Sequence, residues 1–205
     1  MTAIIDYGVG NLFSLESSLK AIGEEPVITG DKNILESADR LILPGVGAFR
    51  DAIAALKESG MGTAVTELAS QGKPVLGICL GMQLMFEKDY EDGVYEGLGF
   101  IPGSVRAISE SIPPVLKIPH TGWNSLILRK PSRLFKYIRE GEYVYFVHSY
   151  HATGCENQTT AVTEYGSMLT AGVECGNLFG TQFHPEKSGD TGLRILKAFT
   201  EVKQC

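Results

Sequence analysis

The 205-residue sequence has few cysteines, no long apolar run and no excess of positive charge. No stretch approaches the roughly 20 apolar residues that a membrane-spanning helix needs. The N-terminal residues 1–6 carry no basic cluster before their short apolar run, so we expect no signal peptide and a cytoplasmic protein. A net charge of -6 offers no electrostatic attraction for nucleic acid or an anionic membrane, and we expect neither as a partner.

The four cysteines show no Cys-x-x-Cys spacing; they are Cys79, Cys155, Cys175 and Cys205. This pattern argues against a structural metal site or a disulfide framework, and it favours one special thiol. We expect no metal and no cofactor. A chain of this length can bury a sufficient core without such links, so we expect one domain over residues 1–205.

The first half alternates short apolar segments with helical patterns. Strands are expected at 3–6, 26–28, 41–43 and 75–78, and helices at 12–22, around 52–56 and 65–69, and at 80–87. Short apolar strands separated by helices are typical of parallel β-α-β units. The pattern therefore predicts an α/β fold with a mostly parallel, doubly wound sheet.

The second half reads mainly as strands, at 104–108, 123–128, 143–148, 159–165, 168–174 and 178–183. Few helices separate them, which favours an additional antiparallel or mixed β portion beside the parallel core. A final helix is expected, with Asp190 or Thr191 as its cap and Leu193, Leu196 and Phe199 facing inward.

Gly77 and Gly81 flank Cys79 at the spacing of a nucleophile elbow, between an apolar strand and a helix. Such a tight turn forces its central residue into a strained conformation, and neighbours without Cβ let the backbones approach. The sulfur would lie at a helix N-terminus, where backbone N–H dipoles favour the thiolate. The motif predicts that Cys79 is a nucleophile.

A cysteine nucleophile needs a base, and His184 with Glu186 fits that need. Residues two apart in an extended chain point to the same side, so the carboxylate can orient the imidazole. The alternative is an ordinary strand-end histidine beside a solvated carboxylate. Because both elements occur in one α/β chain with Cys79, we favour the catalytic interpretation.

Three further histidines compete as the base, namely His120, His148 and His151, but neither of the last two is followed by an acid two positions on. His120 precedes residues 121–124, which read as a turn in a contact loop. Trp123 is the only tryptophan; a lone Trp usually lies in the core, and an interface anchor is the alternative.

Two glycine-rich turns follow expected strands. Residues 44–47 end a parallel strand at the edge where such sheets place their sites, and their N–H groups suit an oxyanion, although a plain turn is equally compatible. Residues 8–11 resemble half of a dinucleotide fingerprint, but position 13 is Phe13 instead of the third glycine. The pattern therefore does not favour nucleotide binding.

Residues 77–83 together with 184–186 resemble the class I (triad) glutamine amidotransferases. Further segments narrow the resemblance to the family of glutaminase subunits of imidazole glycerol phosphate synthase: 6–11, 43–49, 119–124, 145–150 and 182–188. Together the motifs extend over nearly the whole chain. One departure is Thr121, where that family commonly has Met.

The resemblance implies that Cys79 attacks glutamine through a thioester, with His184 as acid and base and Glu186 holding the ring. It implies an oxyanion hole from backbone N–H groups, and a glutamine pocket. The oxyanion residues would be Leu80 with Val46 or Gly47, and the substrate residues Gln83, Gly47, His148, Ser149 and Tyr150.

The resemblance also implies that ammonia passes to a separate (β/α)₈-barrel cyclase, with Asn11 and Trp123 as expected interface residues. Thr121 and the segment 109–114 leave open a paralogue that feeds another synthase. A non-catalytic binding module and a cysteine peptidase are further alternatives, distinguished by thiol labelling with a glutamine analogue and by substrate.

Overall fold

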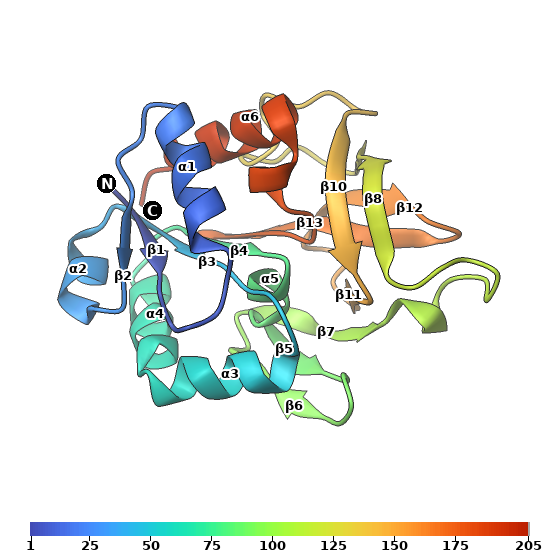
Figure 1. The fold of residues 1–205 in the computed structure, drawn as a ribbon, viewed down its shortest axis with the longest axis horizontal. Coiled ribbons are helices and arrows are strands. Elements are labelled where there is room, and N and C mark those ends of the chain that lie inside the picture. Colours follow the sequence, from blue (N-terminus) through green and yellow to red (C-terminus); the bar gives the residue numbers. More distant parts are fainter. Residues whose placement is uncertain (205) are drawn as a thin grey trace.

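A large mixed sheet forms the centre of the molecule in the computed structural model, which describes residues 1–204 (Figure 1). Its strand order is β2 (Val27–Thr29), β1 (Thr2–Ile5), β3 (Arg40–Leu43), β4 (Val75–Ile78), β14 (Leu178–Thr181), β13 (Met168–Cys175), β12 (Thr159–Glu164) and β9 (Ile127–Leu128). The first five strands are parallel and the last three pairings are antiparallel. The predicted parallel core with an antiparallel extension is confirmed.

Helices cover both faces of the parallel strands. They are α1 (Leu12–Ala21), α2 (Lys32–Ser37), α3 (Phe49–Glu58), α4 (Met61–Ser70), α5 (Leu80–Gln83) and α6 (Gly189–Thr200). Figure 1 shows α1 and α6 on one side of the sheet and α3 and α4 on the other. Within residues 1–204, no helix combines the length and apolar character needed to cross a membrane.

Alternate residues of each parallel strand contribute to the two cores. Ile4, Ile42 and Leu76 belong to the cluster that includes residues of α1 and α6. Ile5 and Leu43, on the opposite face, belong to the cluster that includes residues of α3 and α4. Because both faces are buried, these strands are continuous apolar runs, and this is why they were recognisable in the sequence.

Two smaller sheets flank the large one. One has the order β11 (Tyr150–Thr153), β7 (Ile101–Ala107), β5 (Phe86–Asp89) and β6 (Tyr95–Glu96). The other is a two-stranded antiparallel ribbon of β8 (His120–Ser125) and β10 (Tyr143–His148). Short 3-10 helices, η1 (Ile108–Glu110) and η2 (Pro185–Lys187), complete the fold.

Two local predictions were wrong because long-range strand pairing decides the conformation. A helix was expected to reach residue 87, but α5 ends at Gln83, and Phe86 pairs with Ile101 of β7. Residues 121–124 were expected to form a turn that overlaps the strand expected at 123–128, but all four lie within β8, where Trp123 is paired with Tyr145. The short strands β6 and β11 and the helix α2 were not anticipated.

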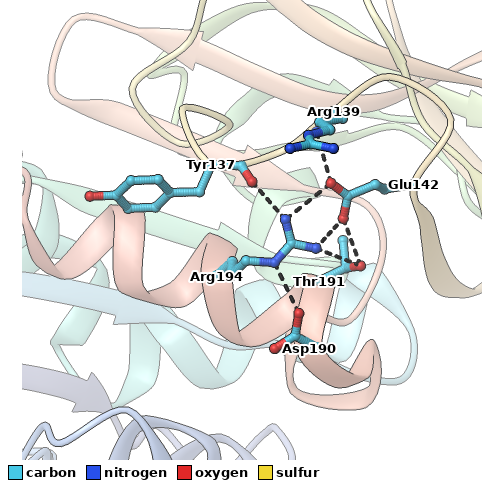
Figure 2. A network of polar contacts seen from close by, with 6 residues as sticks. All are labelled: Tyr137, Arg139, Glu142, Asp190, Thr191 and Arg194. Atoms are coloured by element: carbon cyan, nitrogen blue, oxygen red, sulfur yellow. Dashed lines mark hydrogen bonds and ion pairs between the residues drawn. The ribbon is translucent and has the colours of Figure 1, made fainter.

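The start of α6 also differs from expectation. Ser188 is the N-cap residue and makes no side-chain cap bond, while Asp190 and Thr191 lie inside the first turn. Their side chains contact the Arg194 network instead, in which Glu142 accepts from Arg194 and Thr191 (Figure 2). This network fixes α6, which follows η2 directly, to the loop that precedes β10.

Candidate active site

Cys79 lies at the sharp turn between β4 and α5. Its φ of 54° and ψ of -113° are unusual for a residue with a Cβ atom. A Cβ added to Gly77 would lie 2.7 Å from the Gly81 carbonyl oxygen, and one added to Gly81 would lie 1.9 Å from the Leu43 carbonyl oxygen. The predicted strained turn is therefore present, and both flanking glycines are required by contact.

The turn at 44–47 packs directly against this elbow. A Cβ added to Gly45 would lie 2.6 Å from the Gly81 nitrogen, and Gly47 has a φ of 92° that favours glycine. Leu80 is the first residue of α5, so its N–H belongs to the first turn, where helical N–H groups have no intrahelical partner. The geometry brings the predicted oxyanion residues to Cys79.

His184 and Glu186 meet as the sequence predicted. His184 Nδ1 and Glu186 Oε1 are 2.8 Å apart, and the two side chains are only 3% and 4% exposed. Burial lowers the pKa of His184, but hydrogen bonding and charge from Cys79 and Glu186 outweigh burial and raise that pKa to about 9. With Nδ1 engaged by Glu186, Nε2 is the ring nitrogen available to Cys79.

A cavity of about 310 Å³ opens beside the sulfur. It is lined by Cys79 and His184 together with ten other residues: Val46, Gly47, Leu80, Gln83, Glu91, Pro119, Val147, His148, Ser149 and Tyr150. All of the expected oxyanion and substrate residues are among them. Glu186 lies behind His184, at a much smaller cavity that is also lined by Asn11.

Two residues of the site were missed from the sequence. Gln182 is fully buried, and its Nε2 lies 3.7 Å from Cys79 Sγ while its Oε1 accepts from Gln83 Nε2 at 3.0 Å. Its position two residues before His184, on the same extended segment, could have identified it. Glu91 lines the cavity and accepts the Phe49 N–H, but no local pattern marks a carboxylate that follows an unanticipated strand.

The other histidines are unsuited to act as the base. Burial is the main cause that lowers the pKa of His120 to about 4, of His148 to about 3 and of His151 to about 4, so all three are neutral near pH 7. Among them only His148 lines the cavity, and its ring nitrogens are both engaged by His120 and the Tyr150 carbonyl.

The two expected interface residues have different surroundings. Trp123 is 55% exposed and packs edge-on against Tyr145, so the interpretation of Trp123 as a core residue was wrong. Asn11 is half-buried and caps α1 by accepting the Ser14 N–H. In the described residues, Cys79, Cys155 and Cys175 are free thiols and no cluster of three potential metal ligands occurs; Cys205 lies outside those residues.

Comparison with known proteins identifies similar sequences over the whole chain. The chain is 50% identical over 206 residues to imidazole glycerol phosphate synthase subunit HisH of Caldanaerobacter subterraneus subsp. tengcongensis, covering 100% of both chains. It is 48% identical to the subunit of the same name from Carboxydothermus hydrogenoformans, over 98% of this chain and 100% of the relative.

Among solved structures, PurLQS from Thermotoga maritima aligns with a TM-score of 0.75 at 20% identity, over 97% of this chain and 96% of that chain; this likeness concerns the fold alone. A family model described as glutamine amidotransferase class-I matches residues 3–202. Since that match spans almost the whole sequence, this chain belongs to the class-I glutamine amidotransferase family.

Proposed function

We propose that this protein is the glutaminase subunit of an imidazole glycerol phosphate synthase and releases ammonia from L-glutamine for histidine biosynthesis. The observation that carries the proposal is the meeting of Cys79 and a charged His184 at a cavity large enough for one amino acid, with the buried Glu186 bonded to the far side of the His184 ring. The full-length similarity to subunits of that name supports the choice of synthase.

The first half-reaction forms a thioester. The Cys79 thiolate attacks the side-chain amide carbon of glutamine, and the carbonyl oxygen takes up the negative charge. Backbone N–H groups of Leu80 and of Val46 or Gly47 stabilise this oxyanion. As the carbon–nitrogen bond breaks, protonated His184 gives its proton to the nitrogen, which leaves as ammonia.

The second half-reaction releases glutamate. His184, now neutral, accepts a proton from water, and the resulting hydroxide attacks the thioester carbon. The second oxyanion collapses, the carbon–sulfur bond breaks, and the Cys79 thiolate is restored. Throughout both steps Glu186 fixes the tautomer and orientation of the imidazole and stabilises its cation.

Other residues of the cavity lining suit the amino-acid portion of glutamine. The Glu91 carboxylate suits the α-ammonium group, because an ionised acceptor makes the stronger hydrogen bonds. Gln83 and the segment His148 to Tyr150 supply amide and backbone groups for the remaining polar atoms. A free α-amino acid therefore fits better than a peptide, which disfavours the cysteine peptidase alternative.

Ammonia becomes ammonium in water and loses its nucleophilicity, so a synthase must receive it directly. We infer that the receiving subunit is a separate (β/α)₈-barrel cyclase and that the exposed Trp123 is an anchor of the interface. We infer that Asn11, which lines the smaller cavity beside Glu186, is also an interface residue. Thr121 lies on the exposed side of β8. A pull-down with the cyclase separates this partner from that of a paralogue.

Substitution of the nucleophile tests the proposal. In the complex with cyclase and its ribotide ligand, Cys79→Ala should abolish glutamate production, a loss of at least about 10³-fold, while cyclase binding persists. Cys155→Ala is the matched control, since Cys155 is also a buried free thiol and lies outside the cavity. Unchanged glutamate production by Cys79→Ala would refute the assignment.

A further inference from the structure

His120 and His148 form a buried pair that the triad chemistry does not use. They lie directly opposite one another in the antiparallel register of β8 and β10, and they are only 3% and 5% exposed. His120 Nδ1 lies 2.9 Å from His148 Nε2. The His120 ring is stacked between Phe146 and Tyr165, with centroid separations of 4.9 and 4.1 Å, so it has little freedom to turn.

The hydrogen-bond partners assign the protons of both rings. His148 Nδ1 lies 2.8 Å from the Tyr150 carbonyl oxygen, which can only accept, so Nδ1 carries the hydrogen. A neutral His148 then accepts at Nε2, and His120 Nδ1 must donate to it. His120 Nε2 is left as an acceptor, and Asn124 Nδ2 donates to it at 3.2 Å. Every bond in the series has one donor and one acceptor.

The series continues to the nucleophile. The Tyr150 carbonyl also accepts from Gln83 Nε2 at 3.2 Å, and Gln83 Nε2 donates to Gln182 Oε1 at 3.0 Å. Gln182 Nε2 is in turn the group that faces Cys79 Sγ. Gln83, His148 and Tyr150 all line the glutamine cavity, so the series supports one wall of it.

We propose that His120 is a positioning residue for glutamine binding: by donating to His148 it fixes the Tyr150 carbonyl and, through it, the Gln83 amide. His120 itself does not line the cavity and touches no reacting atom. The inference rests on the proposed glutaminase function. The proposed role requires that His120, on the inner face of the β8–β10 ribbon, be a neutral imidazole with its proton on Nδ1.

Kinetics of the intact complex test the inference. His120→Leu removes the donor at similar volume and should raise KM for glutamine about tenfold, with kcat changed less than about threefold because the triad is untouched. His120→Asn keeps an N–H near the position of Nδ1 and should recover most of the loss. The control is His151→Leu, which removes an equally buried histidine whose Nε2 contacts only Ser111 among the described side chains.

Equal KM values in His120→Leu and His151→Leu, or no recovery in His120→Asn, would overturn the inference. A second measurement requires no variant to fold: long-range ¹H–¹⁵N spectra of the wild-type protein should show His120 and His148 neutral and protonated at Nδ1. A proton at Nε2 of either ring would equally overturn it. An active wild-type enzyme with such results refutes only the role of His120, whereas a wild-type complex that releases no glutamate refutes the proposed function.

Discussion

The site uses histidine in two opposite ways. We call Cys79, His184 and Glu186 the charged wall of the site, and His120 and His148 the neutral wall. Beside Cys79, His184 is held by Glu186, and its pKa is raised to about 9. Elsewhere in the cavity lining, His148 is paired with His120, and burial lowers the pKa of both rings far below neutrality. All three side chains are buried, so neighbouring groups decide the sign of the shift. Hydrogen bonding and charge from Cys79 and Glu186 raise the pKa of His184, whereas His148 and His120 face each other and the effect of burial prevails.

The difference shows how one protein separates proton transfer from positioning. A charged imidazole can give up a proton during the reaction, which the triad needs. A neutral imidazole has one donor and one acceptor, which gives a hydrogen-bond series a fixed direction. The charged wall depends on close backbone packing around Cys79, and the neutral wall depends on side-chain hydrogen bonds. We therefore expect the first to tolerate substitution far less than the second.

The largest expected effect is at the elbow. Gly81→Ala would place a methyl group 1.9 Å from the Leu43 carbonyl oxygen, so β3 and α5 must separate. We expect a loss of more than about 3 kcal/mol in the free energy of unfolding, measured in urea, and no glutaminase activity. Gly62→Ala in α4 is the control, because its nearest neighbour would be 3.3 Å away and helix propensity favours alanine.

The control should change the free energy of unfolding by no more than about 1 kcal/mol. If Gly81→Ala were as stable and as active as wild type, the elbow would not depend on backbone contact, and the contrast between the walls would lose its physical basis.

The next effect is the opposite pH dependence of the two kinds of histidine. The folded pKa of His184 exceeds the unfolded value near 6.5, so its contribution to stability is complete below pH 6.5 and is lost as the pH rises through about 9. We expect a loss of about 2–3 kcal/mol over that window in urea unfolding of the wild type. His184→Asn should remove it.

The neutral histidines should act on the acid side. In the unfolded state His151 takes up a proton near pH 6.5, whereas in the folded state burial delays this protonation until about pH 4. Stability therefore falls as the pH drops through that window. His151→Leu should lessen the slope by up to about 1.4 kcal/mol per pH unit. The same alkaline slope in His184→Asn as in wild type, or an unchanged acid slope in His151→Leu, would contradict the assigned charge states.

The parallel half of the fold was readable from the sequence, and the second half only in part. β1 and β4 came within a residue of the expected positions because strands buried on both faces are uninterrupted apolar runs. β5 and β11 were missed because their pattern is mixed and partners distant in sequence hold them in extended form. Local periodicity contains no information about such pairing.

The candidate site divides in the same way. Cys79, His184 and Glu186 were identifiable because the elbow and the i, i+2 spacing are local. Gln182 and Glu91 were not identified. The i, i+2 spacing to His184 could have pointed to Gln182, whereas the role of Glu91 comes from contacts between segments that the fold brings together. Trp123 illustrates the same limit, since its exposure follows from which face of β8 it occupies.

The smallest effect concerns charge outside the cavity, in the network of Figure 2. Glu142 accepts from Arg194, from Thr191 Oγ1 at 3.0 Å and from the Arg139 N–H at 2.9 Å. Hydrogen bonding to Arg194 is the main cause that lowers the pKa of Glu142 to about 2. Its contribution to stability is therefore present above pH 4.5 and is lost as the pH falls through about 2.

Glu142→Gln should reduce the free energy of unfolding at pH 7 by about 1 kcal/mol, because one accepting oxygen becomes an amide that faces donors. Glu16→Gln is the control: it breaks a single exposed i, i+4 pair with Lys20 and should cost only about 0.3 kcal/mol. Both variants should keep wild-type kcat, since neither residue lines the cavity.

A loss of kcat in Glu142→Gln alone would mean that the anchoring of α6 affects His184 through Ser188, whose hydroxyl donates to the His184 carbonyl. The charged wall would then depend on surface hydrogen bonds as well as on close backbone packing around Cys79. Close packing alone would no longer distinguish it from the neutral wall.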